Sequence, residues 1–190
     1  MEQATLKAQI MDEQAMRRAL TRIAHEIIER NEGADHLALV GVVRRGAVIA
    51  PLLADEIVKI EGVRPTVGTL DVSFYRDDVT RAIQPVMFRT DIPFAVDGAD
   101  IILVDDVLYT GRTIRAALDA LIDLGRPKTV QLAVMIDRGH RELPIRADYV
   151  GKNVPSSHEE DVRLCVSPFD DKTSVEIWTK PTEQHEGGAR

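Results

Sequence analysis

The 190-residue chain has a single cysteine, Cys165, and only 4% of its residues are aromatic. One cysteine cannot form an internal disulfide, which excludes a disulfide-stapled secreted scaffold and suits a reducing compartment. Because Cys165 lies in the apolar alternation of residues 162–166, we expect it to be a buried small side chain rather than a nucleophile. The chain also lacks the roughly 20 consecutive apolar residues of a membrane helix and a secretory signal at its N-terminus. We therefore expect a cytoplasmic protein with no membrane partner.

Positive charge is also in deficit. Lysine and arginine total 24 against 31 aspartates and glutamates, for a formal net charge of −7. This balance argues against general affinity for nucleic acid, so RNA binding would require a local basic patch. The chain has no G-x-x-x-x-G-K-[ST] and no G-x-G-x-x-G after a strand, which excludes a P-loop and a dinucleotide fingerprint. His25-Glu26 is followed by Glu29 where a zinc protease has its second histidine, which excludes that class.

The hydrophobic pattern alternates short apolar runs with amphipathic stretches. This predicts an α/β fold with a mostly parallel sheet flanked by helices, and we interpret residues 1–190 as one domain. We expect helices at 12–31, 46–60 and 113–125, strands at 36–43, 67–75, 101–104 and 130–136, and an antiparallel pair at 162–166 and 174–179. Residues 76–99, with some strand at 86–88, form either a flexible lid or a surface hairpin, and residues 184–190 a frayed tail.

The strongest chemical signal is the stretch 101–113, IILVDDVLYTGRT. Its first four residues predict a buried strand, and Asp105 and Asp106 place two carboxylates at the end of that strand. Carboxylates repel phosphate but accept hydrogen bonds from sugar hydroxyls. One acid would suit a simple strand end, whereas two consecutive acids favour a ligand.

After a short loop, Thr110-Gly111-Arg112-Thr113 opens an amphipathic helix. The unpaired N–H groups and the dipole at a helix N-terminus suit a phosphate, and Gly111 lets the backbone approach it closely. The expected apolar face holds Ile114, Ala117, Leu118, Leu121 and Ile122. Together with the acidic pair, this pattern predicts a site for a phosphorylated ribose beyond the carboxyl end of a strand.

A second candidate anion site follows the strand at 36–43. Arg44 and Arg45 precede Gly46, which begins a helix, so two cations and a helix dipole are available to a pyrophosphate. Basic pairs are common at protein surfaces, so this pattern is weaker than that of residues 101–113.

The stretch 101–113 resembles the phosphoribosyl pyrophosphate (PRPP) loop of the type I phosphoribosyltransferases. Residues 12–30, 75–78 and 137–155 are similar to one group within that family, the bacterial pyrimidine operon attenuation proteins that are also uracil phosphoribosyltransferases. The resemblance implies a parallel sheet with a small hood, and transfer of phosphoribose from PRPP to uracil with Mg²⁺. It also implies UMP-promoted binding to the leader mRNA of pyrimidine genes, which favours termination of transcription, with UTP as a further effector. A homodimer or higher homo-oligomer is expected.

The resemblance also implies roles for particular residues. Catalysis falls to Asp105, Asp106 and Arg45, with Mg²⁺ held mainly by PRPP rather than by direct protein ligands. Arg44 departs from the threonine usual in this group. The implied substrate-binding residues are Arg44, Arg45, Arg76, Asp105, Asp106, Val107, Leu108, Tyr109, Thr110, Gly111, Arg112 and Thr113, with Arg138 and Val162 at the uracil.

A basic face is the implied RNA site. Its expected members are Arg18, Thr21, Arg22, His25, His140, Arg141, Arg146 and Lys152. Composition alone favours a solvated helix face for Arg18, Arg22 and His25, with Arg22 and Glu26 as an ordinary i,i+4 pair. Two alternatives therefore stay open: a plain salvage phosphoribosyltransferase for uracil or a 6-oxopurine without RNA binding, and a regulator whose transferase site only senses nucleotide.

Overall fold

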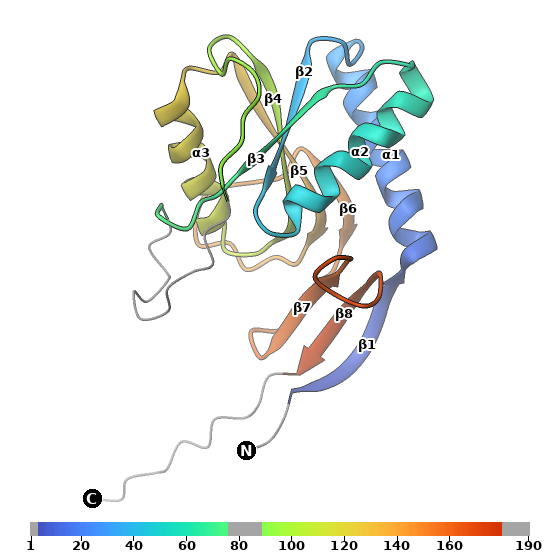
Figure 1. Ribbon diagram of the computed structural model, residues 1–190. Coiled ribbons are helices and arrows are strands. Elements are labelled where there is room, and N and C mark those ends of the chain that lie inside the picture. The colour runs from blue at the N-terminus through green and yellow to red at the C-terminus, as the bar shows by residue number, and fades with distance from the viewer. Residues whose placement is uncertain (1–3, 76–88, 180–190) are drawn as a thin grey trace, which may run out of the picture.

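The computed structural model describes residues 4–75 and 89–179 and contains two sheets (Figure 1). The larger sheet has five parallel strands in the order β3-β2-β4-β5-β6. In chain order these strands are β2 (Leu37–Val42), β3 (Thr66–Leu70), β4 (Asp100–Leu108), β5 (Thr129–Asp137) and β6 (Tyr149–Asn153). Three helices flank this sheet: α1 (Glu13–Asn31), α2 (Gly46–Glu61) and α3 (Arg112–Leu124). The predicted α/β fold with a mostly parallel sheet is confirmed.

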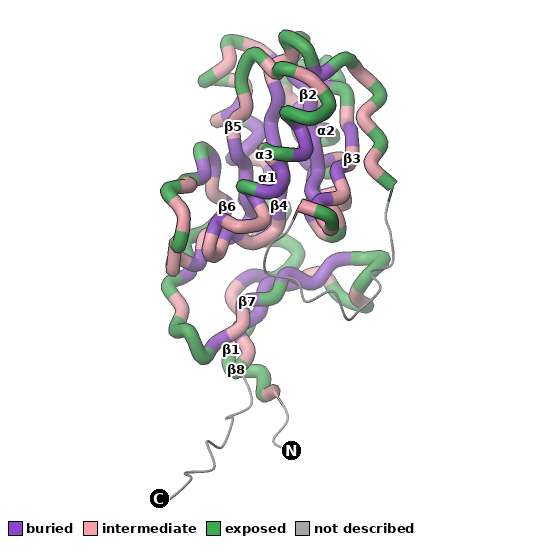
Figure 2. Tube along the Cα trace, turned by 90° about the vertical axis from the view of Figure 1, so that its left-hand side faces the viewer, coloured by how far each residue is buried: buried purple, intermediate pink, exposed green. Residues whose placement is uncertain are grey.

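The parallel sheet is buried on both faces, as Figure 2 shows along its strands. Side chains of a strand alternate between faces, and β4 illustrates the result. Ile102 and Val104 pack into one core with α1 and α2, whereas Ile101 and Leu103 pack into the other with α3. The run of apolar residues at 101–104 therefore reflects two cores rather than one.

Local signals explain where the helices begin and end. Asp12 caps α1 by accepting a hydrogen bond from the Ala15 N–H at 2.7 Å, and the apolar stripe from Met16 to Ile27 is buried. Gly125 ends α3, and its N–H donates to the Leu121 carbonyl at 3.2 Å. Both helices were predicted. On α3, however, Ile122 is 66% exposed, so the prediction that Ile122 lies on the apolar face was wrong. Ala116 and Ala120 are buried on that helix instead.

The second sheet has three antiparallel strands in the order β1-β8-β7. These are β1 (Thr5–Asp12), β7 (Glu160–Cys165) and β8 (Ser174–Thr179). It lies beneath the carboxyl ends of the parallel strands in Figure 1 and forms the expected hood. The β7–β8 pair was predicted, and Cys165 is buried within it as expected, with burial as the first cause of a raised thiol pKa.

The structure corrects several predicted boundaries. The strand that holds the acidic pair runs on to Leu108, so Asp105 and Asp106 lie inside β4 rather than after it. The strand predicted to reach Tyr75 ends at Leu70. Strands β1 and β6 were not predicted. The expected strand at 86–88, Arg76 and the tail 184–190 lie outside the described residues, and none of the described helices is both long and apolar enough to span a bilayer.

Candidate active site and RNA surface

Two loops meet at the carboxyl edge of the parallel sheet, one after β2 and one after β4. These strands are neighbours in register, with Gly41 opposite Val104, so the loops that follow them lie side by side. Gly46 shows how close they are, since a methyl group there would lie 2.4 Å from the Val104 carbonyl oxygen. The basic pair before Gly46 is therefore brought beside the acidic pair of β4.

The acidic pair is held by its own backbone. Asp105 is 6% exposed, and its Oδ1 accepts a hydrogen bond from the Asp106 N–H at 2.9 Å. Asp106 Oδ1 accepts from the Val107 N–H at the same distance. A carboxylate can accept several hydrogen bonds at its two oxygens, which suits acceptance from the hydroxyls of a sugar.

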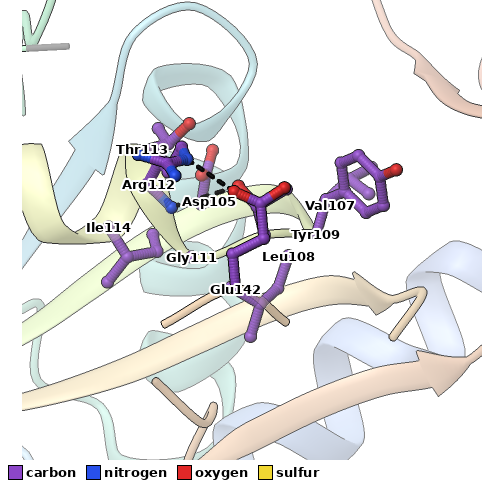
Figure 3. A pocket seen from close by; sticks show the side chains of 10 residues that line it. Asp105, Val107, Leu108, Tyr109, Gly111, Arg112, Thr113, Ile114 and Glu142 are labelled. Atoms are coloured by element: carbon purple, nitrogen blue, oxygen red, sulfur yellow. Dashed lines mark hydrogen bonds and ion pairs between the residues drawn. The ribbon is translucent and has the colours of Figure 1, made fainter. Parts of the chain in front are cut away.

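A cavity of about 230 Å³ lies over the loop between β4 and α3 (Figure 3). Gly111 caps α3 at a φ of 94°, a left-handed conformation that glycine adopts without strain. The cavity is lined by Asp105, Val107, Leu108, Tyr109, Thr110, Gly111, Arg112, Thr113, Ile114 and Glu142. The structure thus brings the predicted loop residues around one hollow, and Asp106 is the member of the acidic pair that does not line it.

Glu142 is a cavity residue that sequence reasoning missed. Its Oε2 accepts from Arg112 Nε at 2.7 Å, the contact drawn in Figure 3. The backbone N–H of Glu142 also donates to the Thr110 carbonyl at 3.0 Å. A phosphate in this cavity would therefore compete with the Glu142 carboxylate for the Arg112 guanidinium. No local pattern marks Glu142, because its partners lie some 30 residues away in the sequence.

The two arginines after β2 differ in their surroundings. Arg44 is exposed and follows a cis peptide bond from Val43. Arg45 is half-buried and forms an ion pair with Asp170, from the loop between β7 and β8, at 3.0 Å. Asp170 is a second residue that the sequence did not single out. Through it the hood contacts the loop predicted to hold pyrophosphate.

The residues assigned to uracil lie where the hood meets the sheet. Arg138 is buried and donates to the Glu160 carbonyl at 2.8 Å and to the Ser157 carbonyl at 3.0 Å. Its guanidinium carbon also lies 4.2 Å from the centre of the Tyr109 ring. Val162 is buried in β7, an edge strand whose backbone is unpaired on one side within the described sheet. The structure thus brings Arg138 and β7 together around the PRPP loop.

The predicted RNA residues of α1 share a surface with β6. Arg18, Arg22 and His25 are exposed. Arg22 donates to the Val150 carbonyl at 3.1 Å and to that of Gly151, besides pairing with Glu26 at 3.4 Å. The next residue along β6 is Lys152, which is exposed. Thr21 differs from its neighbours, because its hydroxyl donates to Glu56 on α2 at 2.8 Å.

The other predicted RNA residues follow β5. Arg146 is exposed. Arg141 is half-buried and donates to four carbonyls, those of Tyr109 at 2.6 Å, Ile145 at 2.9 Å, Gly139 at 3.1 Å and Leu108 at 3.4 Å, and to the Asp137 carboxylate. The guanidinium of Arg141 therefore stabilises the turn beneath the PRPP loop, in addition to any contact that it makes with RNA.

His140 connects this turn with the hood. Its Nε2 donates to the Ser156 carbonyl, because a carbonyl can only accept, and its Nδ1 lies 3.0 Å from His158 Nε2. His158 Nδ1 lies 3.4 Å from the Tyr109 hydroxyl. The candidate RNA-binding residues thus form two groups, one on α1 and β6 and one between β5 and the hood. The second group contacts Tyr109 in the PRPP loop.

Acidic and histidine side chains do not gather into a group of three or more within residues 4–75 and 89–179, so a tight protein cage for a metal is not formed there. Asp105 and Asp106, the acidic pair predicted to contact the ribose, offer the carboxylate oxygen atoms that Mg²⁺ prefers. These donors fit a cation that a substrate brings with it.

Comparisons with known proteins identify the family. Residues 7–166 match the model of the phosphoribosyl transferase domain family. The chain is 60% identical over 172 residues to "Bifunctional protein PyrR" of Pelotomaculum thermopropionicum, covering 90% of this chain and 95% of that protein. It is 55% identical over 177 residues to the protein of the same name from Bacillus mycoides, covering 92% and 98%.

Solved structures show the same fold. A hypoxanthine phosphoribosyltransferase of Trypanosoma cruzi superposes with a TM-score of 0.70 at 18% identity, over 93% of this chain and 98% of that one. A hypoxanthine-guanine phosphoribosyltransferase of Bacillus anthracis gives a TM-score of 0.68 at 17% identity, over 93% and 100%. At these identities the likeness concerns the fold.

Proposed function

The chain belongs to the phosphoribosyltransferase family and, within it, to the bifunctional PyrR proteins, and on this basis we propose a function in two parts. It is a uracil phosphoribosyltransferase and a regulator that attenuates transcription of pyrimidine genes. The observation that carries the first part is the cavity over residues 107–114, with the Asp105 carboxylate at its wall, inside a chain of this family. The exposed basic surface of α1 and β6 supports the second part.

The transfer joins uracil to the ribose of PRPP and releases pyrophosphate. Displacement at the ribose carbon passes through a state with oxocarbenium character, as in glycosyl transfer generally. Asp105 and Asp106 accept hydrogen bonds from the ribose hydroxyls, and the loop from Thr110 to Thr113 binds the 5′-phosphate. Together these contacts hold the reacting ribose carbon in line with the base. The uracil lies against Arg138 and the free edge of β7.

The negative charge of the departing pyrophosphate is stabilised on the side of the ribose opposite the uracil. Arg45, with Arg44 beside it, receives the pyrophosphate at the N-terminus of α2. Asp105 and Asp106 would help to hold a Mg²⁺ ion bound mainly by PRPP, and that ion would neutralise part of the negative charge that develops on the leaving group. Arg76, the remaining residue predicted to bind substrate, lies outside the described residues.

RNA binding uses the basic groups that the chemistry does not need. Arg18, Arg22, Lys152 and Arg146 present positive charge in a chain whose net charge is −7, and the imidazole of His25 is exposed beside them on α1. Phosphate contacts supply affinity, and unpaired bases of the leader mRNA supply specificity. UMP in the active site promotes this binding, UTP acts at the same site, and a homodimer or higher homo-oligomer presents the surface.

A steady-state assay tests the catalytic part. With PRPP and Mg²⁺, the purified protein is expected to convert uracil to UMP and to leave hypoxanthine and guanine essentially unchanged, as its membership of the PyrR group implies. Turnover of a 6-oxopurine in preference to uracil would indicate a purine salvage enzyme. Nucleotide binding without turnover of any base would indicate a sensor.

A further inference from the structure

The loop between β7 and β8 carries a carboxylate that no role yet accounts for. Asp170 accepts from Arg45 Nε at 3.3 Å and from Arg45 Nη2 at 3.0 and 3.2 Å. It also accepts from the Val166 N–H at 3.0 Å, and its own N–H donates to the Val166 carbonyl at 3.1 Å. Asp170 is therefore fixed within the hood turn and reaches across to the loop after β2.

Asp170 is ionised at neutral pH. Burial opposes ionisation, but the Val166 N–H and the Arg45 guanidinium favour it, and together they hold the pKa of Asp170 below its usual range. The contact is thus a charge-assisted pair in which both carboxylate oxygens face one guanidinium edge. With side-chain exposures of 32% for Arg45 and 23% for Asp170, the pair is screened less than a surface ion pair.

The geometry leaves one edge of the guanidinium for a ligand. Asp170 occupies Nε and Nη2 of Arg45, and among the described residues Nη1 has no hydrogen-bond acceptor. A guanidinium is planar, so a pair at one edge fixes the direction in which the other edge points. Arg45 directly precedes Gly46, where an added methyl group would lie 2.4 Å from the Val104 carbonyl oxygen, so the backbone of this loop lies close to the end of β4 that carries the acidic pair.

We propose that Asp170 is a positioning residue for the pyrophosphate end of the substrate. By holding one edge of Arg45, it presents the other edge to the leaving pyrophosphate and ties the hood to the loop after β2. The proposal rests on the proposed function, because it takes PRPP as the substrate.

The opposite arrangement makes the opposite prediction. A carboxylate 3.0 Å from Arg45 could instead compete with pyrophosphate and repel it. If Asp170 only blocked the site, removing its charge would tighten anion binding. The sign of the change in affinity therefore decides between positioning and blocking.

The test compares the full-length wild type with D170N, D170E and D171N. Asp171 is exposed and is the neighbour of Asp170, so D171N removes the same charge without touching Arg45. Calorimetry measures binding of pyrophosphate at fixed Mg²⁺, and steady-state assays measure the KM values for PRPP and uracil. We expect D170N to weaken pyrophosphate binding and raise the KM for PRPP about tenfold, as for loss of one charge-assisted hydrogen bond.

The remaining readouts distinguish positioning from damage to the fold. The KM for uracil should stay within about twofold, D170E should restore most of the affinity, and D171N should resemble the wild type. Unchanged or tighter pyrophosphate binding in D170N overturns the proposal, and so does an equal rise in both KM values. A wild-type protein that binds pyrophosphate but transfers no phosphoribose would refute the proposed function. The calorimetric comparison of the wild type with D170N would still test whether Asp170 supports pyrophosphate binding.

Discussion

The double variant Asp105→Asn, Asp106→Asn is expected to lose UMP synthesis by about 10³-fold or more. A hydrogen bond to a charged group contributes roughly 1.5–3 kcal/mol, and the two carboxylates each accept from the ribose. Their combined loss, about 4 kcal/mol, corresponds to about three powers of ten in rate. The measurement is kcat/KM for PRPP at saturating uracil.

The design keeps the fold intact. Asparagine has the size of aspartate and retains the oxygen that accepts the backbone N–H of the next residue at 2.9 Å. Asp119→Asn is the matched control, because Asp119 lies on α3, half exposed, and pairs only with Arg115 at 3.6 Å. Turnover of the double variant at the wild-type rate would refute the assignment of the ribose to this acidic pair.

Arg18→Gln and Arg146→Gln are each expected to weaken leader-RNA binding about tenfold while uracil transfer stays near the wild-type rate. Both side chains are exposed, and neither lines the cavity over residues 107–114. Loss of one phosphate contact should also reduce the magnitude of the slope of log affinity against log salt by about 0.7. A filter-binding or fluorescence titration over a salt series measures both effects.

The control for this pair is Arg126→Gln. Arg126 is exposed just after α3, on the face of the sheet opposite α1, so its removal changes net charge equally without entering the basic surface. Arg141 is a poor probe, because its guanidinium also holds the backbone of Tyr109. Equal loss of RNA binding and transfer in Arg18→Gln or Arg146→Gln would contradict separate surfaces.

Much of the fold could be predicted because the information was local. The 3.6-residue period and Asp12 define α1, and apolar runs bounded by glycine or charge define β2 and β5. Strands β1 and β6 lie at sheet edges, where half-exposed residues blur the pattern. The strand predicted at β4 was too short, because two consecutive acidic residues are typical of the end of a strand. In the structure Asp105 and Asp106 lie within β4, at the candidate active site.

The part of the candidate site formed by consecutive residues could be predicted from the sequence. Residues 105–113 form such a stretch, and they surround one cavity apart from Asp106. Glu142 and Asp170 could not be found, because each acts on an arginine distant in the sequence, Arg112 and Arg45 respectively. The buried bonds of Arg138 depend in the same way on how the hood docks.

The most direct test of the account is binding of the purified protein to the 5′ leader RNA of its own pyrimidine genes, with and without UMP, over a salt series. The account predicts tight binding that UMP strengthens. With four arginine and lysine contacts at about 0.7 released counterions each, the slope of log affinity against log salt should be about −3. Binding no tighter than to an unrelated RNA, with or without UMP, would contradict the regulatory role and leave a salvage enzyme with a solvated α1 face.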